Sequence, residues 1–134
     1  MLKYVMSGIA LVLALSVSQE TYGQKYTGDT GSGVTVRALS EGQKVEQLIQ
    51  FIQKMQGATF IRNGSEHTCQ EAAEHLRSKW QKHQDKVKTA EGFIEELASR
   101  SGLSGQAYMI RLKDGREITT NEALTRELNR LEQQ

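Results

Sequence analysis

Residues 108–118 read Tyr-Met-Ile-Arg-Leu-Lys-Asp-Gly-Arg-Glu-Ile, and this stretch decides the fold class. Residues 108–112 alternate as the residues of a half-buried strand do. Asp114-Gly115 is the strongest short signal for a hairpin turn, so we expect 116–118 to form the return strand. A lone hairpin is marginally stable in water, and we therefore expect it to pack on helices. The sequence predicts an α+β fold with about four helices and one C-terminal antiparallel β-hairpin.

The helices are predicted from apolar residues that recur at helical spacing. Their expected starts are Gln43, Thr68, Thr89 and Thr119. Thr68 precedes Glu71 by three residues, and Thr119 precedes Glu122 by the same interval, which is the spacing of a capping box. Between the first two helices, residues 60–62 are a short extended piece that ends in a turn. These elements predict one small domain over residues 43–134.

The first part of the chain is expected to lie outside this domain. A positive charge at Lys3 precedes a nearly unbroken apolar run over residues 5–17, and small residues follow it. This pattern predicts a secretory signal peptide over residues 1–23. The alternative is an uncleaved membrane anchor, but the run is shorter than the roughly 20 residues that span a bilayer. Residues 24–42 are rich in Gly, Thr and Ser and are expected to form a flexible leader.

Composition narrows the possible partners. The 134 residues include 17 Lys and Arg against 16 Asp and Glu, for a net charge of +1. This balance argues against nucleic-acid binding driven by bulk charge. We expect the mature protein to be soluble and periplasmic or secreted, with no stable membrane insertion after cleavage.

The densest polar stretch runs from the turn into the second helix. Its candidate site residues are Arg62, Asn63, His67, Glu71, His75 and Arg77. A helix N-terminus suits an anion, because its free amides and its dipole both favour negative charge. The structural alternative is that Asn63 takes a left-handed turn conformation, Thr68 caps the helix, and Arg62 pairs with Glu71. We expect that ion pair, with His75 sharing the same carboxylate and being favoured in its protonated form.

Cys69 has two interpretations. It lies in the first turn of the predicted helix, two residues from His67, so a Cys–His nucleophilic pair is conceivable. It also lies on the apolar stripe with Leu76 and Trp80, and free cysteine is often a small buried hydrophobic residue. We favour the buried thiol. The histidines and Cys69 do not converge along one helix, so the sequence predicts no metal site and indicates no cofactor.

Three blocks of sequence resemble a known family. The first contains Phe60-Ile61-Arg62-Asn63-Gly64, His67-Thr68-Cys69 and His75-Leu76-Arg77, the second lies over 89–99, and the third includes Ser104-Gly105 and Tyr108. Over roughly residues 44–128 they resemble the YfeK-like family of small exported bacterial proteins, a domain of unknown function. The resemblance implies export and a shared fold, but no activity.

These observations favour a non-enzymatic periplasmic module that binds a protein partner or a small anionic ligand through the polar stretch. The alternative is a small thiol- or His-dependent hydrolase that uses Cys69 or His67. An assembly role for the last, amphipathic helix is a third possibility. Burial of Cys69 against the helix stripe would favour the binding module, whereas a Cys69–His67 hydrogen bond in a cleft would favour the enzyme.

Overall fold

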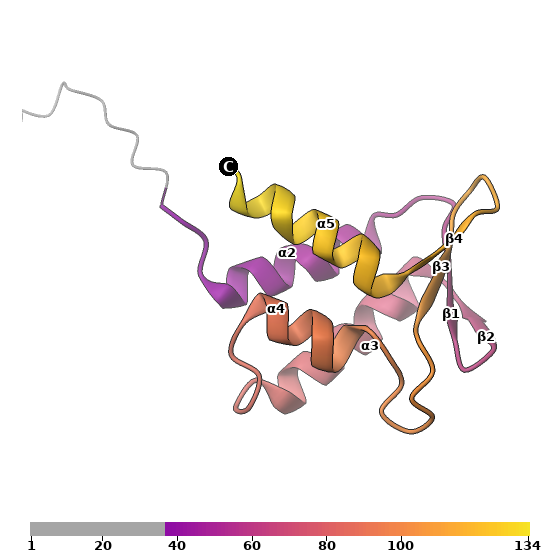
Figure 1. Ribbon diagram of the computed structural model, residues 1–134, viewed down its shortest axis with the longest axis horizontal. Coiled ribbons are helices and arrows are strands. Elements are labelled where there is room, and N and C mark those ends of the chain that lie inside the picture. The colour runs from indigo at the N-terminus through magenta and orange to yellow at the C-terminus, as the bar shows by residue number, and fades with distance from the viewer. Residues whose placement is uncertain (1–36) are drawn as a thin grey trace, which may run out of the picture. The chain divides into compact units, whose positions relative to one another are not determined.

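The computed structural model describes residues 37–134. The predicted signal peptide and most of the predicted leader lie outside these residues. The described elements, in chain order, are α2 (Glu41–Gln53), β1 (Thr59–Arg62), β2 (Ser65–His67), α3 (Cys69–His83), α4 (Ala90–Gly92), the π-helix η1 (Phe93–Ala98), β3 (Met109–Arg111), β4 (Glu117–Thr119) and α5 (Thr120–Glu132). They form a small α+β domain in which the helices lie to one side of the sheet (Figure 1).

The sheet is larger and placed differently from our prediction. It has four antiparallel strands in the order β2-β1-β3-β4. The hairpin predicted at 108–118 is present as β3 and β4, but the extended piece at 60–62 is a full strand that pairs with both β2 and β3. The prediction of a single C-terminal hairpin is therefore wrong, and the sheet lies in the middle of the chain. The prediction lacked the β1–β3 pairing, which joins segments that are far apart in sequence.

The helix starts that were predicted from local sequence patterns agree closely with the structure. Thr68 caps α3 with the predicted reciprocal contacts to Glu71, and the side chain of Thr119 accepts from the backbone N–H of Glu122 at the start of α5. The first helix starts at Glu41, two residues before the prediction, because Ser40 forms a capping box with Gln43. The third helical segment is mostly a π-helix, η1. The spacing of the apolar residues did not indicate this wider winding of the backbone.

The core lies between the helices and one face of the sheet. Its largest fully buried side chains are Phe93, Leu48, Ile49, Ile52, Ile94, Ile110, Leu124 and Val45. Trp80 meets Phe93 edge to face at 5.9 Å between ring centroids. On the opposite face of the sheet, Arg111 forms ion pairs with Glu66 and Glu117. The helix-facing side of the sheet is thus apolar at Phe60 and Ile110, where it meets the core, and the other side carries the ion pairs of Arg111.

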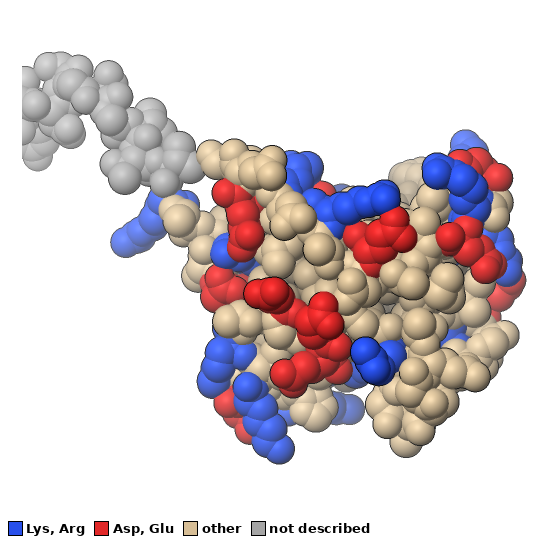
Figure 2. All heavy atoms as spheres, viewed as in Figure 1, with Lys and Arg blue, Asp and Glu red and all other residues tan. Residues whose placement is uncertain are grey.

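The molecular surface carries both signs of charge. Figure 2 shows acidic side chains gathered on the viewed face over α4 and α5. Four glutamates line a hollow there: Glu41, Glu91, Glu95 and Glu132. Within residues 37–134 no helix is long and apolar enough to cross a membrane.

Candidate functional site

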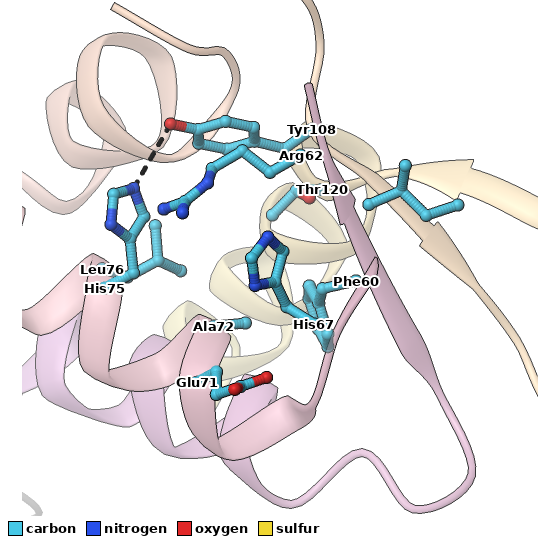
Figure 3. Close-up of a pocket in the computed structure, with 10 residues that line it drawn as sticks. Phe60, Arg62, His67, Glu71, Ala72, His75, Leu76, Tyr108 and Thr120 are labelled. Atoms are coloured by element: carbon cyan, nitrogen blue, oxygen red, sulfur yellow. Dashed lines mark hydrogen bonds between the residues drawn. The ribbon is translucent and has the colours of Figure 1, made fainter. Parts of the chain in front are cut away.

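A cavity of about 250 Å³ lies where β1, β2 and α3 meet the residues that precede β3 and begin α5. Its walls are Phe60, Ile61, Arg62, His67, Glu71, Ala72, His75, Leu76, Tyr108 and Thr120. Figure 3 shows the guanidinium of Arg62 between the rings of His75 and His67, with Tyr108 beside it. The cavity therefore combines an apolar wall with a cluster of nitrogen-bearing side chains.

Strand register brings the polar residues together. Phe60 and Arg62 lie on the same face of β1, because side chains alternate along a strand. β1 pairs Ile61 with Met109, and β3 pairs Met109 with Thr119. One step further along the same register, Arg62, Tyr108 and Thr120 fall in one row across the sheet. The backbone N–H of Thr120 donates to the carbonyl of Tyr108 at 2.9 Å and continues this row beyond the strands.

His67 enters the cavity from the first hairpin. It is paired with Phe60 across β1 and β2, so both side chains lie on the helix-facing side of the sheet. The turn that joins these strands is Asn63-Gly64, with Asn63 at φ 52° and Gly64 at φ 76°. Asn63 adopts the left-handed conformation that was predicted for it in the turn. A two-residue turn with both φ values positive fits the right-handed twist of the hairpin.

The predicted Arg62–Glu71 ion pair is absent. Within residues 37–134 no carboxylate oxygen lies within 4 Å of the Arg62 guanidinium. The Glu71 carboxylate instead accepts from the backbone N–H of Thr68 at 2.8 Å. That hydrogen bond is the largest cause that lowers the pKa of Glu71. The capping box thus occupies the acid that would have neutralised the arginine.

His75 also differs from the prediction. Its Nε2 lies 3.4 Å from the hydroxyl of Tyr108 instead of sharing the Glu71 carboxylate. Burial, reinforced by the nearby charges of Arg62, Lys79, His67 and Lys82, lowers the pKa of His75 to about 4. The imidazole is therefore neutral at pH 7, not protonated as we predicted.

Lys79 adds a second cation behind the cavity. Its ammonium donates to the Tyr108 hydroxyl at 3.3 Å and lies 5.2 Å from the centroid of that ring. Burial, with Arg62 as the second cause, lowers the pKa of Lys79. Because the hydroxyl oxygen accepts from Lys79, its proton is free to point to the neutral imidazole of His75.

Two polar atoms of the cavity wall have no hydrogen-bond partner in the described part of the chain. They are Nε2 of His67 and Oγ1 of Thr120, both buried. Only 1% of the surface of Thr120 is exposed. Unpartnered buried polar atoms are uncommon in folded proteins, and they concentrate where a ligand, an ion or a water completes the structure.

The other predicted site residues lie elsewhere. Asn63 fastens the turn to the loop before β3, donating to Ser101 Oγ at 3.3 Å and accepting from Ser104 Oγ at 2.5 Å. Arg77 pairs with Glu46 of α2 at 2.9 Å. The structure therefore brings together Arg62, His67 and His75, places Glu71 in the wall with its carboxylate engaged, and leaves Asn63 and Arg77 outside.

The sequence did not group Tyr108 and Thr120 with this cluster, and it placed Lys79 in the polar stretch without naming it as a site residue. Tyr108 was interpreted as the start of a strand, and Thr120 as part of a helix start. The signal that links them to Arg62 is the β1–β3–β4 register, which no local motif reveals. Lys79 follows His75 by four residues and so shares its helix face, a spacing that places the two side chains together.

Cys69 is partly buried and packs against the core. Its thiol is directed to the backbone carbonyls of Met55, at 2.7 Å, and Ala58, at 3.4 Å. Among the described residues it makes no hydrogen bond to His67. No group of three or more His, Cys, Asp or Glu side chains in residues 37–134 is arranged to hold a metal ion.

Comparison with known proteins defines the class. The chain matches the model of a family of unknown function, DUF5329, over residues 39–132, and it belongs to that family. It is 35% identical over 68 residues to the uncharacterized protein YfeK of Salmonella typhimurium. The aligned part covers 51% of this chain and 57% of YfeK, so the chain spans little more than half the length of that relative. The resemblance to YfeK-like proteins is confirmed, and no solved structure matches.

Proposed function

We propose that this protein is a non-enzymatic binding module that takes a small anion into the cavity at Arg62. The observation that carries the proposal is a partly buried guanidinium that faces a cavity without a carboxylate partner. A buried or partly buried charge is costly when unpaired, and an entering anion would repay that cost. Arginine is well suited to the task because its planar fork donates two parallel hydrogen bonds to a carboxylate or a phosphate.

The surroundings of Arg62 also support an anion-binding site. Lys79 adds positive charge behind the cavity, and the pKa of His75 is lowered in part by these cations. The unpartnered atoms of His67 and Thr120 lie in the same wall. The lining supplies several donors, and its one carboxylate, that of Glu71, accepts the Thr68 backbone N–H and makes no ion pair with Arg62.

The test is a titration of ¹⁵N-labelled protein with acetate, benzoate and inorganic phosphate, followed by NMR. We expect saturable shifts around the cavity with at least one of these anions. Arg62→Gln should weaken that binding by about tenfold or more, because a charge-assisted bidentate contact is lost. Arg77→Gln is the matched control, since Arg77 is paired outside the cavity, and it should bind as the wild type does. Absence of saturable shifts with all three anions, or equal binding by Arg62→Gln, would refute the proposal.

We further propose that the protein is exported to the periplasm or secreted. The support is the charged start, apolar run and small residues over 1–23, together with the resemblance to exported proteins. N-terminal sequencing of protein recovered from the periplasm should give a chain that begins at Gln19 or Gln24. Recovery of the full-length chain from the membrane fraction would overturn this.

A further inference from the structure

The cavity has two chemically distinct parts. Arg62, His67, His75 and Tyr108 form its nitrogen-rich and hydroxyl-bearing part, whereas Phe60, Ala72 and Leu76 supply an apolar wall (Figure 3). Phe60 and Leu76 are core residues that are 6% and 3% exposed, so this wall is rigidly backed by packed side chains. An inorganic anion would contact the first part and leave the second one covered only by water.

The size of the cavity also exceeds what an inorganic anion needs. An apolar cavity of about 150 Å³ in another protein accepts benzene, and a water molecule takes about 30 Å³ of liquid volume. At about 250 Å³, this cavity has room for a ring-sized body together with a charged group. Its opening to solvent allows such a molecule to enter without unfolding of the walls.

The donors on the polar side match one carboxylate. A carboxylate offers about four lone-pair positions, and the Arg62 fork can fill two of them. The hydroxyl of Thr120 and Nε2 of His67 are the two further groups that lack a partner. Both atoms are covered in this arrangement, so each reaches a ligand only when its side chain rotates. Among the described residues that line the cavity, Arg62 is the one Lys or Arg, and the carboxylate of Glu71 is turned to the helix cap, so the guanidinium is left to pair with one negative charge of a ligand.

We propose that the ligand is a small monocarboxylic acid with an apolar body about the size of a benzene ring. Its carboxylate pairs with Arg62, and its body lies against Phe60, Ala72 and Leu76. This inference rests on the proposed anion-binding function and adds the class of ligand to it.

The test compares four probes on the full chain by isothermal titration calorimetry: benzoate, acetate, benzamide and inorganic phosphate. Benzoate should bind about tenfold or more tightly than acetate, because the ring removes additional apolar surface from water. Benzamide keeps the ring but has no charge, so it should bind at least about tenfold more weakly than benzoate. These two ratios define the proposed ligand class.

Ala72 provides a variant that alters the apolar side alone. Ala72→Leu places a larger side chain in the cavity and should remove the advantage of benzoate over acetate, whereas Ala72→Ser preserves the volume and should retain most of it. Thermal unfolding of both variants shows whether they are folded. Because the wild-type probe series needs no variant, the inference stays testable if Ala72→Leu fails to fold.

The outcomes separate this inference from the function on which it rests. If phosphate or acetate binds as tightly as benzoate and binding depends on Arg62, the anion site stands and the proposed ligand class is wrong. If benzamide binds as tightly as benzoate, the charge is irrelevant and both proposals fail. If no probe binds, both fail as well.

Discussion

The neutral state of His75 makes the stability of this protein dependent on pH in a defined direction. The pKa of His75 is about 4 in the folded protein against 6.5 for an unperturbed histidine. The unfolded chain therefore takes up a proton near pH 6.5 that the folded chain takes up only near pH 4. The free energy of unfolding should accordingly fall as pH falls from 6.5 to 4, and the contribution of His75 should be constant above that window.

The magnitude follows from the difference between the two pKa values. At about 1.4 kcal/mol per pKa unit, its upper limit is about 3.4 kcal/mol below pH 4. His75 is only partly buried, and solvent screening reduces this to about 1–2 kcal/mol. Between pH 7.5 and pH 5 we expect a loss of about 1 kcal/mol that is attributable to His75.

The assay is urea unfolding at pH 7.5 and pH 5, followed by the fluorescence of Trp80. This residue is the single tryptophan of the chain and packs against the buried Phe93. Wild type should lose about 1 kcal/mol more than His75→Gln between the two pH values, because the variant has no imidazole to protonate. His83→Gln, at an exposed position, is the control and should behave as the wild type. An equal loss in wild type and His75→Gln would refute the reasoning.

Three further outcomes are expected from urea unfolding. Arg62→Gln should change the free energy of unfolding by less than about 0.5 kcal/mol or stabilise the protein, since no ion pair is lost and repulsion of Lys79 is relieved; a loss of several kcal/mol would reveal a hidden partner. Cys69→Ser should cost at most about 1 kcal/mol, because the hydroxyl can donate to the same carbonyls. Cys69→Val removes the donor and should cost about 1–3 kcal/mol. Equal costs for the two variants would contradict this. A double-mutant cycle of Arg77 and Glu46 should give a coupling of about 0.2–1 kcal/mol, and strict additivity would show that the pair is absent.

The sequence predicted the elements whose signals are local. The capping pattern at Thr68 and Glu71 located α3, and Asp114-Gly115 located the second hairpin, because each signal depends on residues a few positions apart. The Asn63-Gly64 turn was recognised as a turn, but β2 after it has only three residues and no apolar alternation. β2 pairs with β1, and β1 pairs in turn with β3. Pairing between segments that are far apart in the chain cannot be predicted from the residues of one segment alone.

The candidate site was predicted in part for the same reason. Arg62, His67 and His75 were grouped because they are close in sequence, and the fold does bring them to one cavity. The predicted partner of Arg62 was wrong because the Glu71 carboxylate accepts from the backbone N–H of Thr68 in the helix cap, only three residues away, instead of pairing with the arginine. His75 was assigned a charge from a supposed carboxylate neighbour, whereas its burial and its cationic neighbours determine its state. Arg77, two residues further along α3, projects to another side and meets α2.

The row of Arg62, Tyr108 and Thr120 has a consequence for how this domain tolerates changes of length. Arg62 lies in β1, Tyr108 directly precedes β3, and Thr120 directly follows β4. Adding one residue to the Asp114-Gly115 turn would shift the β3–β4 pairing and reverse which side chains of β4 face the helices. Adding one to the Asn63-Gly64 turn would do the same to β2 and remove His67 from the cavity. The loop between η1 and β3 has no such constraint at its tip, where Leu103 is 99% exposed. Insertions should therefore be tolerated better at Leu103 than in the two tight turns, as long as the flanking Ser101 and Ser104 keep their hydrogen bonds to Asn63.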